Sequence, residues 1–377
     1  MKHIHITFVG GQPAPVYHGI VATKPDKVVF IYSGNSRHVL ERICDEINLP
    51  YEEIELEPIN PLKIRECAQK LADTYKDDKI TLNISSGLKS WSHLFGVVFD
   101  KMDNAEVVYM DQNNVLWNYK TMRSQGDFEF DMHALFRLYD NPLEKYKEYS
   151  DYTQADKEVI DVIEKIRKFS FPKFNALTVY LKPAQEDLIK RCEGKIVHPQ
   201  DTNSFVEWKQ NSNKDTEVSI CLSDKKGKRF VKMVSPHAKD LIFHAGWFEF
   251  KVANILASWN RAKKIYLNCR FPFKQNVDKN ETDIIVDTGT RVLFVECKTQ
   301  INAITDIDKF RSVIKNYGGT GSKGLFVTQA QMTDIAKEKC KDNGILSFSL
   351  EDGLCGLPVD KALFSLLDYE LFNINTK

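Results

Sequence analysis

The sequence predicts an α/β protein of two domains joined by a helix, and three observations lead to this prediction. In the first 140 residues, short apolar runs alternate with helical patterns, as in proteins built on a mainly parallel sheet. Residues 153–168 have apolar side chains at helical spacing behind Thr153, a residue type that caps helices. Residues 246–298 predict a helix followed by a β-hairpin that ends in charged residues. We therefore expect a first domain, a helical linker and a second α/β domain over residues 1–140, 141–170 and 171–377.

The composition excludes a protein that coats nucleic acid through its overall charge. Lysines and arginines number 52 and aspartates and glutamates also number 52, so binding of nucleic acid requires a local groove. The eight cysteines form no C-x-x-C pair and no disulfide-like framework, which indicates a reducing compartment. The sequence contains no recognisable signal peptide and no apolar run of membrane-spanning length. We expect a cytoplasmic protein that does not enter the membrane.

In the first domain, short runs of apolar or β-branched residues predict the strands of a mainly parallel sheet. These runs are Ile4–Val9, Lys27–Tyr32, Ile80–Ile84 and Glu106–Met110. Helical patterns between and after them include Leu62–Leu71 and Ser92–Lys101. In such sheets a ligand binds beyond the carboxyl ends of the strands, so the segments that follow the strands hold the candidate binding residues.

Turn-forming polar residues follow three of these strands. Their sequences are Gly10-Gly11-Gln12-Pro13, Ser33-Gly34-Asn35-Ser36 and Asn83-Ile84-Ser85-Ser86-Gly87-Leu88-Lys89-Ser90. The third leads directly into an apolar helix, whose free amide groups and positive dipole end favour phosphate. It lacks the earlier glycine and the adjacent Gly-Lys pair of a P-loop, so it predicts a phosphate or nucleotide site of another type. An ordinary capped helix start is the alternative.

In the second domain, Asp283 and the triplet Glu296-Cys297-Lys298 are the candidate active-site residues. Glu-x-Lys occurs at three other places, but only this triplet closes a continuous apolar run, residues 292–295, of the kind found in strands buried on both faces. The two-residue period of a strand places Glu296 and Lys298 on one side. A tight turn at residues 288–290 then brings Asp283 beside Glu296.

These residue types suit metal-dependent hydrolysis of a phosphodiester. Carboxylates supply hard oxygen ligands for a divalent cation, which neutralises nonbridging oxygens and lowers the pKa of a bound water. Lys298 can orient the attacking water or stabilise charge on phosphorus-bound oxygens. Glu249, beside the apolar stripe of the helix 246–256, is a third candidate carboxylate. The alternative is a solvated strand end with a surface ion pair, which contributes only about 0–1 kcal/mol.

Two further patterns bear on the second domain. Strand patterns near residues 217–222 and 229–233 predict a hairpin that enters it. Downstream, a helical core stripe over residues 310–317 leaves Arg311 and Lys315 together on another face. We expect these two cations to contact the backbone of a nucleic-acid substrate, against the alternative of a solvated basic face.

The order of a helix acid, a strand aspartate and a strand Glu-x-Lys resembles the PD-(D/E)xK restriction-endonuclease-like nucleases. Thr282 stands where that family has proline, a residue that is not itself a ligand. The resemblance implies metal ligation by Asp283, Glu296 and Glu249. It implies that these three carboxylates and Lys298 form the catalytic set.

The three polar turns of the first domain resemble the CRISPR-associated Rossmann-fold sensor domain, called CARF. The order of the whole chain, sensor first and nuclease second, resembles the cyclic-oligoadenylate-activated ancillary nucleases of type III CRISPR defence. The resemblance implies a homodimer with one composite pocket for a cyclic oligoadenylate, most often the tetra-adenylate. It implies that single-stranded DNA or RNA is cut, and that duplexes are nicked, with Mn²⁺ or Mg²⁺. By position, the pocket residues would be Gly11, Gln12, Ser33, Ser85, Ser86, Gly87 and Lys89.

Two other functions remain open at this point. A constitutive DNA repair or restriction-type nuclease would cut with a cation and without any cyclic nucleotide. A nonenzymatic nucleotide-sensing regulator would keep the carboxylates as a relic and would bind no manganese tightly. Assays with and without cyclic oligoadenylates, and titration with manganese, distinguish the three.

Overall fold

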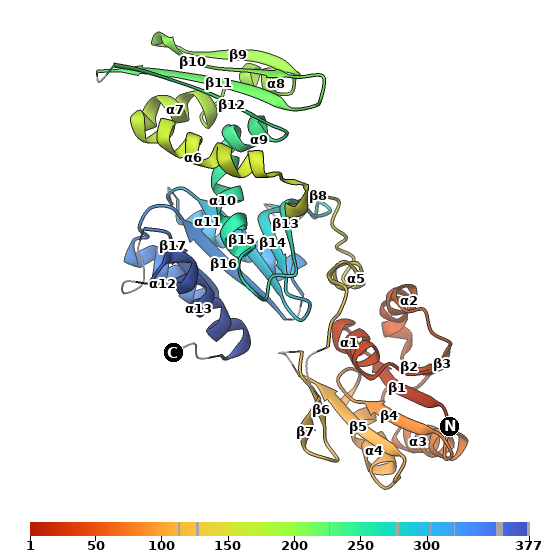
Figure 1. Ribbon diagram of the computed structural model, residues 1–377. Coiled ribbons are helices and arrows are strands. Elements are labelled where there is room, and N and C mark those ends of the chain that lie inside the picture. Colours follow the sequence, from red (N-terminus) through yellow and green to blue (C-terminus); the bar gives the residue numbers. More distant parts are fainter. Residues whose placement is uncertain are drawn as a thin grey trace.

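Three β-sheets organise the chain in the computed structural model (Figure 1). A seven-stranded sheet belongs to the first domain, a six-stranded sheet lies in the middle of the molecule, and a four-stranded sheet forms the opposite end. No helix among the described residues is long and apolar enough to cross a membrane. The structure describes residues 1–111, 114–125, 128–225, 227–275, 279–301, 303–319, 321–351 and 357–374.

The seven-stranded sheet has the order β3-β2-β1-β4-β5-β6-β7, and its first five strands are parallel. The four predicted strands are confirmed as β1, β2, β4 and β5, whereas β3 was not predicted because its solvated side chains alternate with half-buried ones, as at a sheet edge. The strands are His3–Val9 (β1), Lys27–Tyr32 (β2), Tyr51–Glu55 (β3), Lys79–Asn83 (β4), Ala105–Met110 (β5), Leu116–Asn118 (β6) and Arg123–Ser124 (β7).

Helices cover both faces of this sheet. One face packs against α1 (Ala14–Thr23) and α2 (Arg37–Glu46), and the other against α3 (Pro61–Thr74) and α4 (Lys89–Phe99). The chain therefore leaves the neighbouring strands β1 and β4 toward opposite faces. In open α/β sheets, ligands bind at such a change of direction, beyond the carboxyl ends of the two strands.

The six-stranded sheet has the order β17-β16-β15-β14-β13-β8. The antiparallel hairpin of β14 and β15 forms as expected, and Gly289 adopts a φ of +81° in its turn. Helix α10 (Gly246–Leu256) covers one face of the sheet and α11 (Thr305–Tyr317) the other. The strands are Lys145–Glu148 (β8), Lys264–Arg270 (β13), Glu281–Asp287 (β14), Val292–Lys298 (β15), Ser322–Thr328 (β16) and Ile345–Ser349 (β17), and the remaining helices are α12 (Asp334–Asp342) and α13 (Val359–Phe372).

The four-stranded antiparallel sheet contains a hairpin that we expected in the second domain's main sheet. The hairpin predicted near residues 217–233 forms as β11 and β12, but it belongs to this separate sheet and not to the six-stranded one. The expected helix after Thr153 is α6, which packs across this sheet with α7 and α9. The elements are β9 (Glu193–His198), β10 (Asp201–Gln210), β11 (Thr216–Asp224), β12 (Gly227–Ser235), α6 (Gln154–Phe169), α7 (Phe171–Thr178), α8 (Pro183–Ile189) and α9 (Ala238–Ile242).

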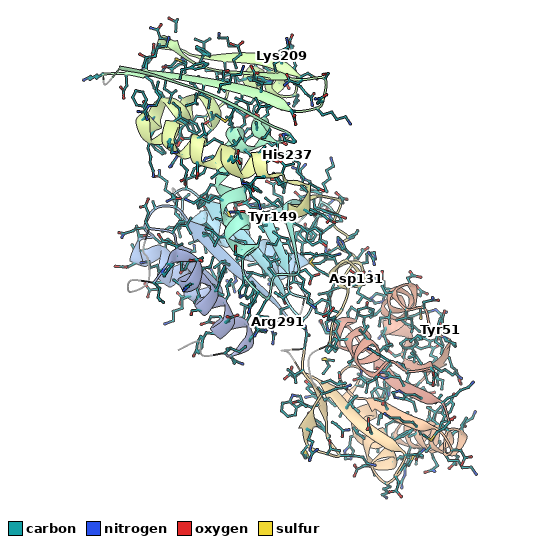
Figure 2. All side chains as sticks on the ribbon, in the orientation of Figure 1. Tyr51, Asp131, Tyr149, Lys209, His237 and Arg291 are labelled. Carbon is teal, nitrogen blue, oxygen red and sulfur yellow. The ribbon has the colours of Figure 1, made fainter. Side chains whose placement is uncertain are left out.

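The first domain is joined to the six-stranded sheet by packing and by hydrogen bonds. Helix α5 (Met132–Leu138), with Asp131 at its N-cap, lies between them (Figure 2). One apolar cluster runs from Phe30 of β2 through Phe136 of α5 to Phe294 of β15. Asn114 also donates from Nδ2 to the carbonyl oxygen of Thr290 at 3.2 Å, in the turn between β14 and β15. The first domain therefore touches the hairpin that carries the candidate active site.

Candidate active site

Asp283 and Glu296 lie side by side at one end of the central hairpin. Ile284 pairs with Val295 in the antiparallel register, so the next residues along, Asp283 and Glu296, face each other. Asp283 Oδ2 accepts the Cys297 amide hydrogen at 2.7 Å, which fixes the carboxylate against β15. The turn at residues 288–290 thus places two acids, one from each strand of the hairpin, at one sheet end.

Glu296 is a buried carboxylate held by two lysines. Its exposed fraction is 2%. Lys298 Nζ lies 2.8 Å from Oε1, and Lys279 Nζ lies 2.7 Å from both carboxylate oxygens. Burying a carboxylate is costly unless cations and hydrogen bonds compensate it. The solvated strand end, our alternative reading of this triplet, does not describe this site. Lys279 was not anticipated, because no spacing or motif links it to the triplet.

The carboxyl groups of this cluster interact electrostatically. Burial, followed by the charge of Glu296, raises the pKa of Asp283 to about 6. Glu249, in the first turn of α10, has a pKa well above its ordinary value, because of burial and then because of the charge of Asp283. Burial alone would lower the pKa of Lys298, but Asp283 and Glu296 raise it above the ordinary lysine value. The charges of Glu249, Asp283 and Lys298 therefore influence one another.

The donor set of this group suits a hard divalent cation. Two adjacent carboxylates offer oxygen ligands, and the raised pKa values of Asp283 and Glu249 indicate negative charge that a cation would stabilise. Within the described residues, no three histidine, cysteine, aspartate or glutamate side chains are arranged as a complete metal-binding group. Asp283 and Glu296 are the pair that fits a cation, and Glu249 adds a third negative charge nearby.

The raised pKa of Asp283 predicts a stability effect. Because the folded pKa lies above the ordinary value of 3.8, folding disfavours the ionised form, and this cost appears as pH rises from about 4 to about 6 and persists above. Asp283→Asn should therefore increase the free energy of unfolding at about pH 7.5, without divalent cations, by on the order of 1–2 kcal/mol. Thermal melts at about pH 7.5 and pH 4 measure the change, which should vanish at the lower pH.

Glu281→Gln is the matched control, since Glu281 lies on the same strand but is half exposed and paired with Arg270. It should shift the melting temperature little at either pH. A loss of stability in Asp283→Asn at about pH 7.5 would contradict the electrostatic account of the cluster.

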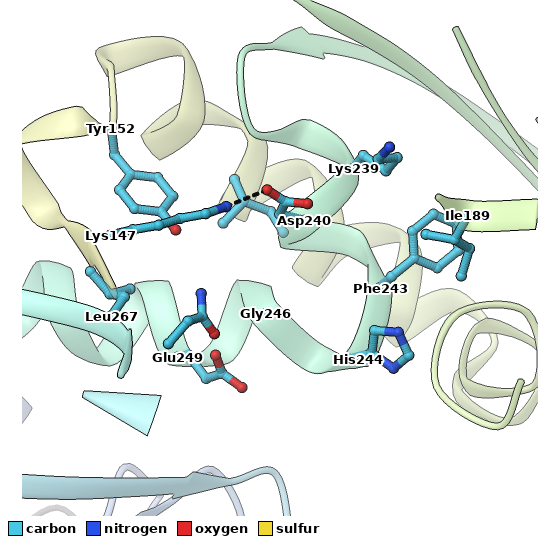
Figure 3. A pocket seen from close by; sticks show the side chains of 12 residues that line it. Lys147, Tyr152, Ile189, Lys239, Asp240, Phe243, His244, Gly246, Glu249 and Leu267 are labelled. Atoms are coloured by element: carbon cyan, nitrogen blue, oxygen red, sulfur yellow. Dashed lines mark hydrogen bonds and ion pairs between the residues drawn. The ribbon is translucent and has the colours of Figure 1, made fainter. Parts of the chain in front are cut away.

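Two cavities flank Glu249. The first has a volume of about 310 Å³ and is lined by Lys147, Tyr152 and Asp240 among others. Figure 3 shows Lys147 paired with Asp240 beside the Tyr152 ring, with Glu249 below them in this view. The second has a volume of about 220 Å³ and reaches from Arg167 to Lys298. Glu249, the candidate catalytic carboxylate, therefore lines both cavities.

The candidate binding residues of the first domain gather at the carboxyl ends of β1, β2 and β4. The Gly10 amide donates to Ser86 Oγ at 3.1 Å, and Ser86 Oγ donates to the Gln12 carbonyl oxygen at 3.3 Å. Gly87 requires glycine, since its φ is +81° and an added Cβ would lie 2.4 Å from Phe8 Cβ. Gly11, Gln12, Gly87 and Lys89 are exposed, whereas Ser33, Ser85 and Ser86 are half-buried.

The structure places Arg311 and Lys315 away from the candidate catalytic residues. Helix α11 follows β15 and runs back along the sheet, so residues farther along the helix lie farther from Lys298. Arg311 Nη1 donates to Asn343 Oδ1 at 2.8 Å, just before β17, at the end of the sheet opposite to Lys298. Neither cation lines the two cavities beside Glu249. Contact with more distant parts of a substrate stays a prediction.

Three solved structures resemble this chain over most of its length. Can2 from Sulfobacillus thermosulfidooxidans, solved in complex with cyclic tetra-adenylate, has a TM-score of 0.64 and 16% identity over 98% of this chain and 99% of its own. Protein VC1899 from Vibrio cholerae has a TM-score of 0.69 and 14% identity over 98% of both chains. A type III CRISPR defence DNA nuclease activated by cyclic oligoadenylate has a TM-score of 0.55 and 14% identity over 95% of this chain and 52% of its own.

No protein-family model and no curated protein sequence matches the chain. The structural likenesses nevertheless confirm the predicted fold class: a Rossmann-like, mainly parallel sheet domain is followed by a restriction-endonuclease-like α/β domain. The chain shares its fold with Can2, which was solved with cyclic tetra-adenylate, and with a type III CRISPR defence DNA nuclease activated by cyclic oligoadenylate.

Proposed function

We propose that this protein is a cyclic-oligoadenylate-activated endonuclease of type III CRISPR defence, which cuts single-stranded DNA or RNA as a homodimer with Mn²⁺ or Mg²⁺. The observation that carries the proposal is the convergence of Asp283, Glu296 and Lys298 at the end of β15. The whole chain also follows the fold of Can2 bound to cyclic tetra-adenylate.

The nuclease site acts through charges that are already in place. A bound divalent cation would neutralise phosphate charge and acidify a water molecule. Lys298 stays protonated because Asp283 and Glu296 raise its pKa, so it serves as a fixed positive charge for the developing phosphorane oxygens and not as a general base. Lys279 and the Cys297 amide fix the carboxylates of Glu296 and Asp283, which reduces reorganisation during the reaction.

The activator site is the exposed edge where the loops after β1 and β4 meet. The start of α4, with Lys89 as its first residue, offers donors to phosphate. A ring with two-fold symmetry suits an edge shared by two copies of the chain, since an isologous dimer presents the same residues twice. Gly11, Gln12, Gly87 and Lys89 would then contact the ligand from both protomers.

A path for activation starts at this same edge. Tyr139, just after α5, donates its hydroxyl to Gln12 Oε1 at 3.1 Å. The ring of Tyr139 also lies against Gly319, where an added Cβ would be 2.8 Å from Cε2. Gly319 precedes β16, the strand that pairs with β15. A ligand that repositions Gln12 can therefore favour one arrangement of the nuclease sheet, which is how binding shifts a conformational equilibrium.

The proposal is tested by incubating labelled single-stranded DNA and RNA with the purified protein and manganese, with and without a panel of cyclic oligoadenylates. Cutting should require one of the cyclic nucleotides. Lys89→Ala should raise the concentration of activator needed for half-maximal cutting by about tenfold, as expected for loss of one charge-assisted hydrogen bond.

Lys101→Ala is the matched control, because Lys101 is an exposed lysine just beyond the other end of α4. It should leave the activation curve unchanged. Full-rate cutting without any cyclic nucleotide would favour the constitutive nuclease, and binding of the nucleotide without cutting would favour the nonenzymatic regulator.

A further inference from the structure

The second cavity beside Glu249 is lined both by helices α6 and α7, which pack on the four-stranded sheet, and by residues at the end of β15. Its lining includes Arg167 of α6, Phe171 of α7 and Tyr180. It also includes Trp247 and Glu249 of α10 and Lys298 of β15. The cavity therefore opens directly onto the candidate catalytic group, and residues outside the six-stranded sheet form its outer wall.

Arg167 is a cation that lines this cavity. Its guanidinium lies between two aromatic rings, 4.5 Å from the ring centre of Phe171 and 5.0 Å from that of Trp247. Within the part of the chain that the structure describes, its side chain forms no hydrogen bond or ion pair. Burial lowers its pKa and the charges of Glu164 and Glu351 oppose that shift, but neither carboxylate forms an ion pair with the guanidinium. The rings orient a planar group whose N–H donors are available to a bidentate acceptor such as phosphate.

Two aromatic side chains at the cavity are exposed to solvent. Tyr180 is 65% exposed and Phe171 is 37% exposed. Exposed aromatic rings beside a cation are the usual means by which proteins bind single-stranded nucleic acid, since a base stacks on the ring while the cation binds the backbone. The cavity volume is about 220 Å³, below the roughly 300–1,000 Å³ of typical ligand pockets, so the cavity has room for at most one nucleotide and not for a stacked base pair.

We propose that this cavity is the subsite for the nucleotide adjacent to the scissile phosphate of a single-stranded substrate, with Arg167 bound to its phosphate and Tyr180 stacked on its base. The inference rests on the proposed function and adds the residues that select an unpaired strand. It also gives the segment from α6 to α7 a role, as the wall that excludes a duplex from the catalytic group.

The test compares Arg167→Ala with Lys168→Ala, which removes a positive charge from the neighbouring, exposed position of the same helix. With activator and manganese present, Arg167→Ala should raise the KM for a single-stranded oligonucleotide by about tenfold or more and leave kcat within about threefold. The plot of log affinity against log salt should become less steep by about 0.7, the value for one phosphate contact on a single strand. Lys168→Ala should change neither the KM nor the slope of log affinity against log salt.

Two variants of Tyr180 test the subsite if a thermal melt shows that Arg167→Ala does not fold. Tyr180→Ala removes a solvent-exposed ring and should weaken binding of the oligonucleotide by on the order of tenfold, whereas Tyr180→Phe should retain it. Binding is measured by fluorescence anisotropy, which does not depend on cutting.

The outcomes separate this inference from the proposed function. A wild-type protein that binds the strand through Arg167 and Tyr180 but never cuts it would overturn the nuclease and keep the subsite. A wild-type protein that cuts, with Arg167→Ala and Tyr180→Ala indistinguishable from Lys168→Ala, would overturn the subsite and keep the nuclease.

Discussion

Glu296→Gln should lower the rate of cutting by at least about 10²-fold, while the affinity for the cyclic nucleotide stays unchanged. The substitution preserves the shape of the side chain but removes one of two adjacent carboxylates, and it leaves Lys279 and Lys298 without their shared anion. Lys298→Gln should cause a loss of similar size, since a fixed positive charge near the reacting phosphate is worth about 10²–10³ in rate. Single-turnover cleavage of a labelled oligonucleotide measures both.

The matched control is again Glu281→Gln, which alters an exposed carboxylate on the strand beside Glu296. It should cut at nearly the wild-type rate. If Glu296→Gln or Lys298→Gln also cut at that rate, the active site would lie elsewhere in the chain.

Removal of divalent cations by a chelator should abolish cutting, and added Mn²⁺ or Mg²⁺ should restore it. The adjacent carboxylates of Asp283 and Glu296 repel each other, and part of that repulsion appears as the raised pKa of Asp283. Because a cation must displace the proton from Asp283 below about pH 6, the cation concentration needed for half-maximal cutting should rise about tenfold for each pH unit below that value.

The pH dependence distinguishes this site from one that binds its cation through unperturbed carboxylates. Such a site would keep a constant cation requirement down to about pH 4. Cutting at full rate by a thoroughly chelated protein would contradict a cation mechanism altogether.

Much of the fold could be predicted, because the apolar runs in the sequence coincide with the strands that are buried in the structure. Strands β1, β2, β4 and β5 are almost fully buried, so their apolar runs are unmistakable in the sequence. Strand β3 could not be predicted this way, because it lies at the edge and three of its five side chains are exposed. Strand β8 lies within the expected helical linker, and its charged sequence acquires strand structure only by pairing with β13.

The candidate site was predicted in part. The hairpin turn and the strand period bring Asp283, Glu296 and Lys298 together, and both features are local in the sequence. Lys279 and Arg167 could not be found in the same way. They reach the site from a loop and from a helix of another layer, through contacts that only the tertiary structure defines. Arg311 and Lys315 were placed on a common helix face correctly, but the direction of α11 carries them away from the cluster.

The sequence did not predict that β9 to β12 form a sheet of their own. The hairpin of β11 and β12 has ordinary strand patterns, which do not reveal the sheet to which a strand belongs. Strands β9 to β12 pair with one another in a separate sheet, and α6 and α7 lie between this sheet and the end of β15 that carries the candidate catalytic residues. The sheet thus lies where it can restrict access to the site.

Diffraction from crystals soaked in Mn²⁺, recorded at the manganese absorption edge, tests the central claim most directly. We expect an anomalous peak within coordination distance of Asp283 and Glu296, at roughly 2.0–2.6 Å from oxygen, and its loss in Asp283→Asn. A manganese peak bound elsewhere, with these two carboxylates still held only by Lys279, Lys298 and the Cys297 amide, would contradict the account.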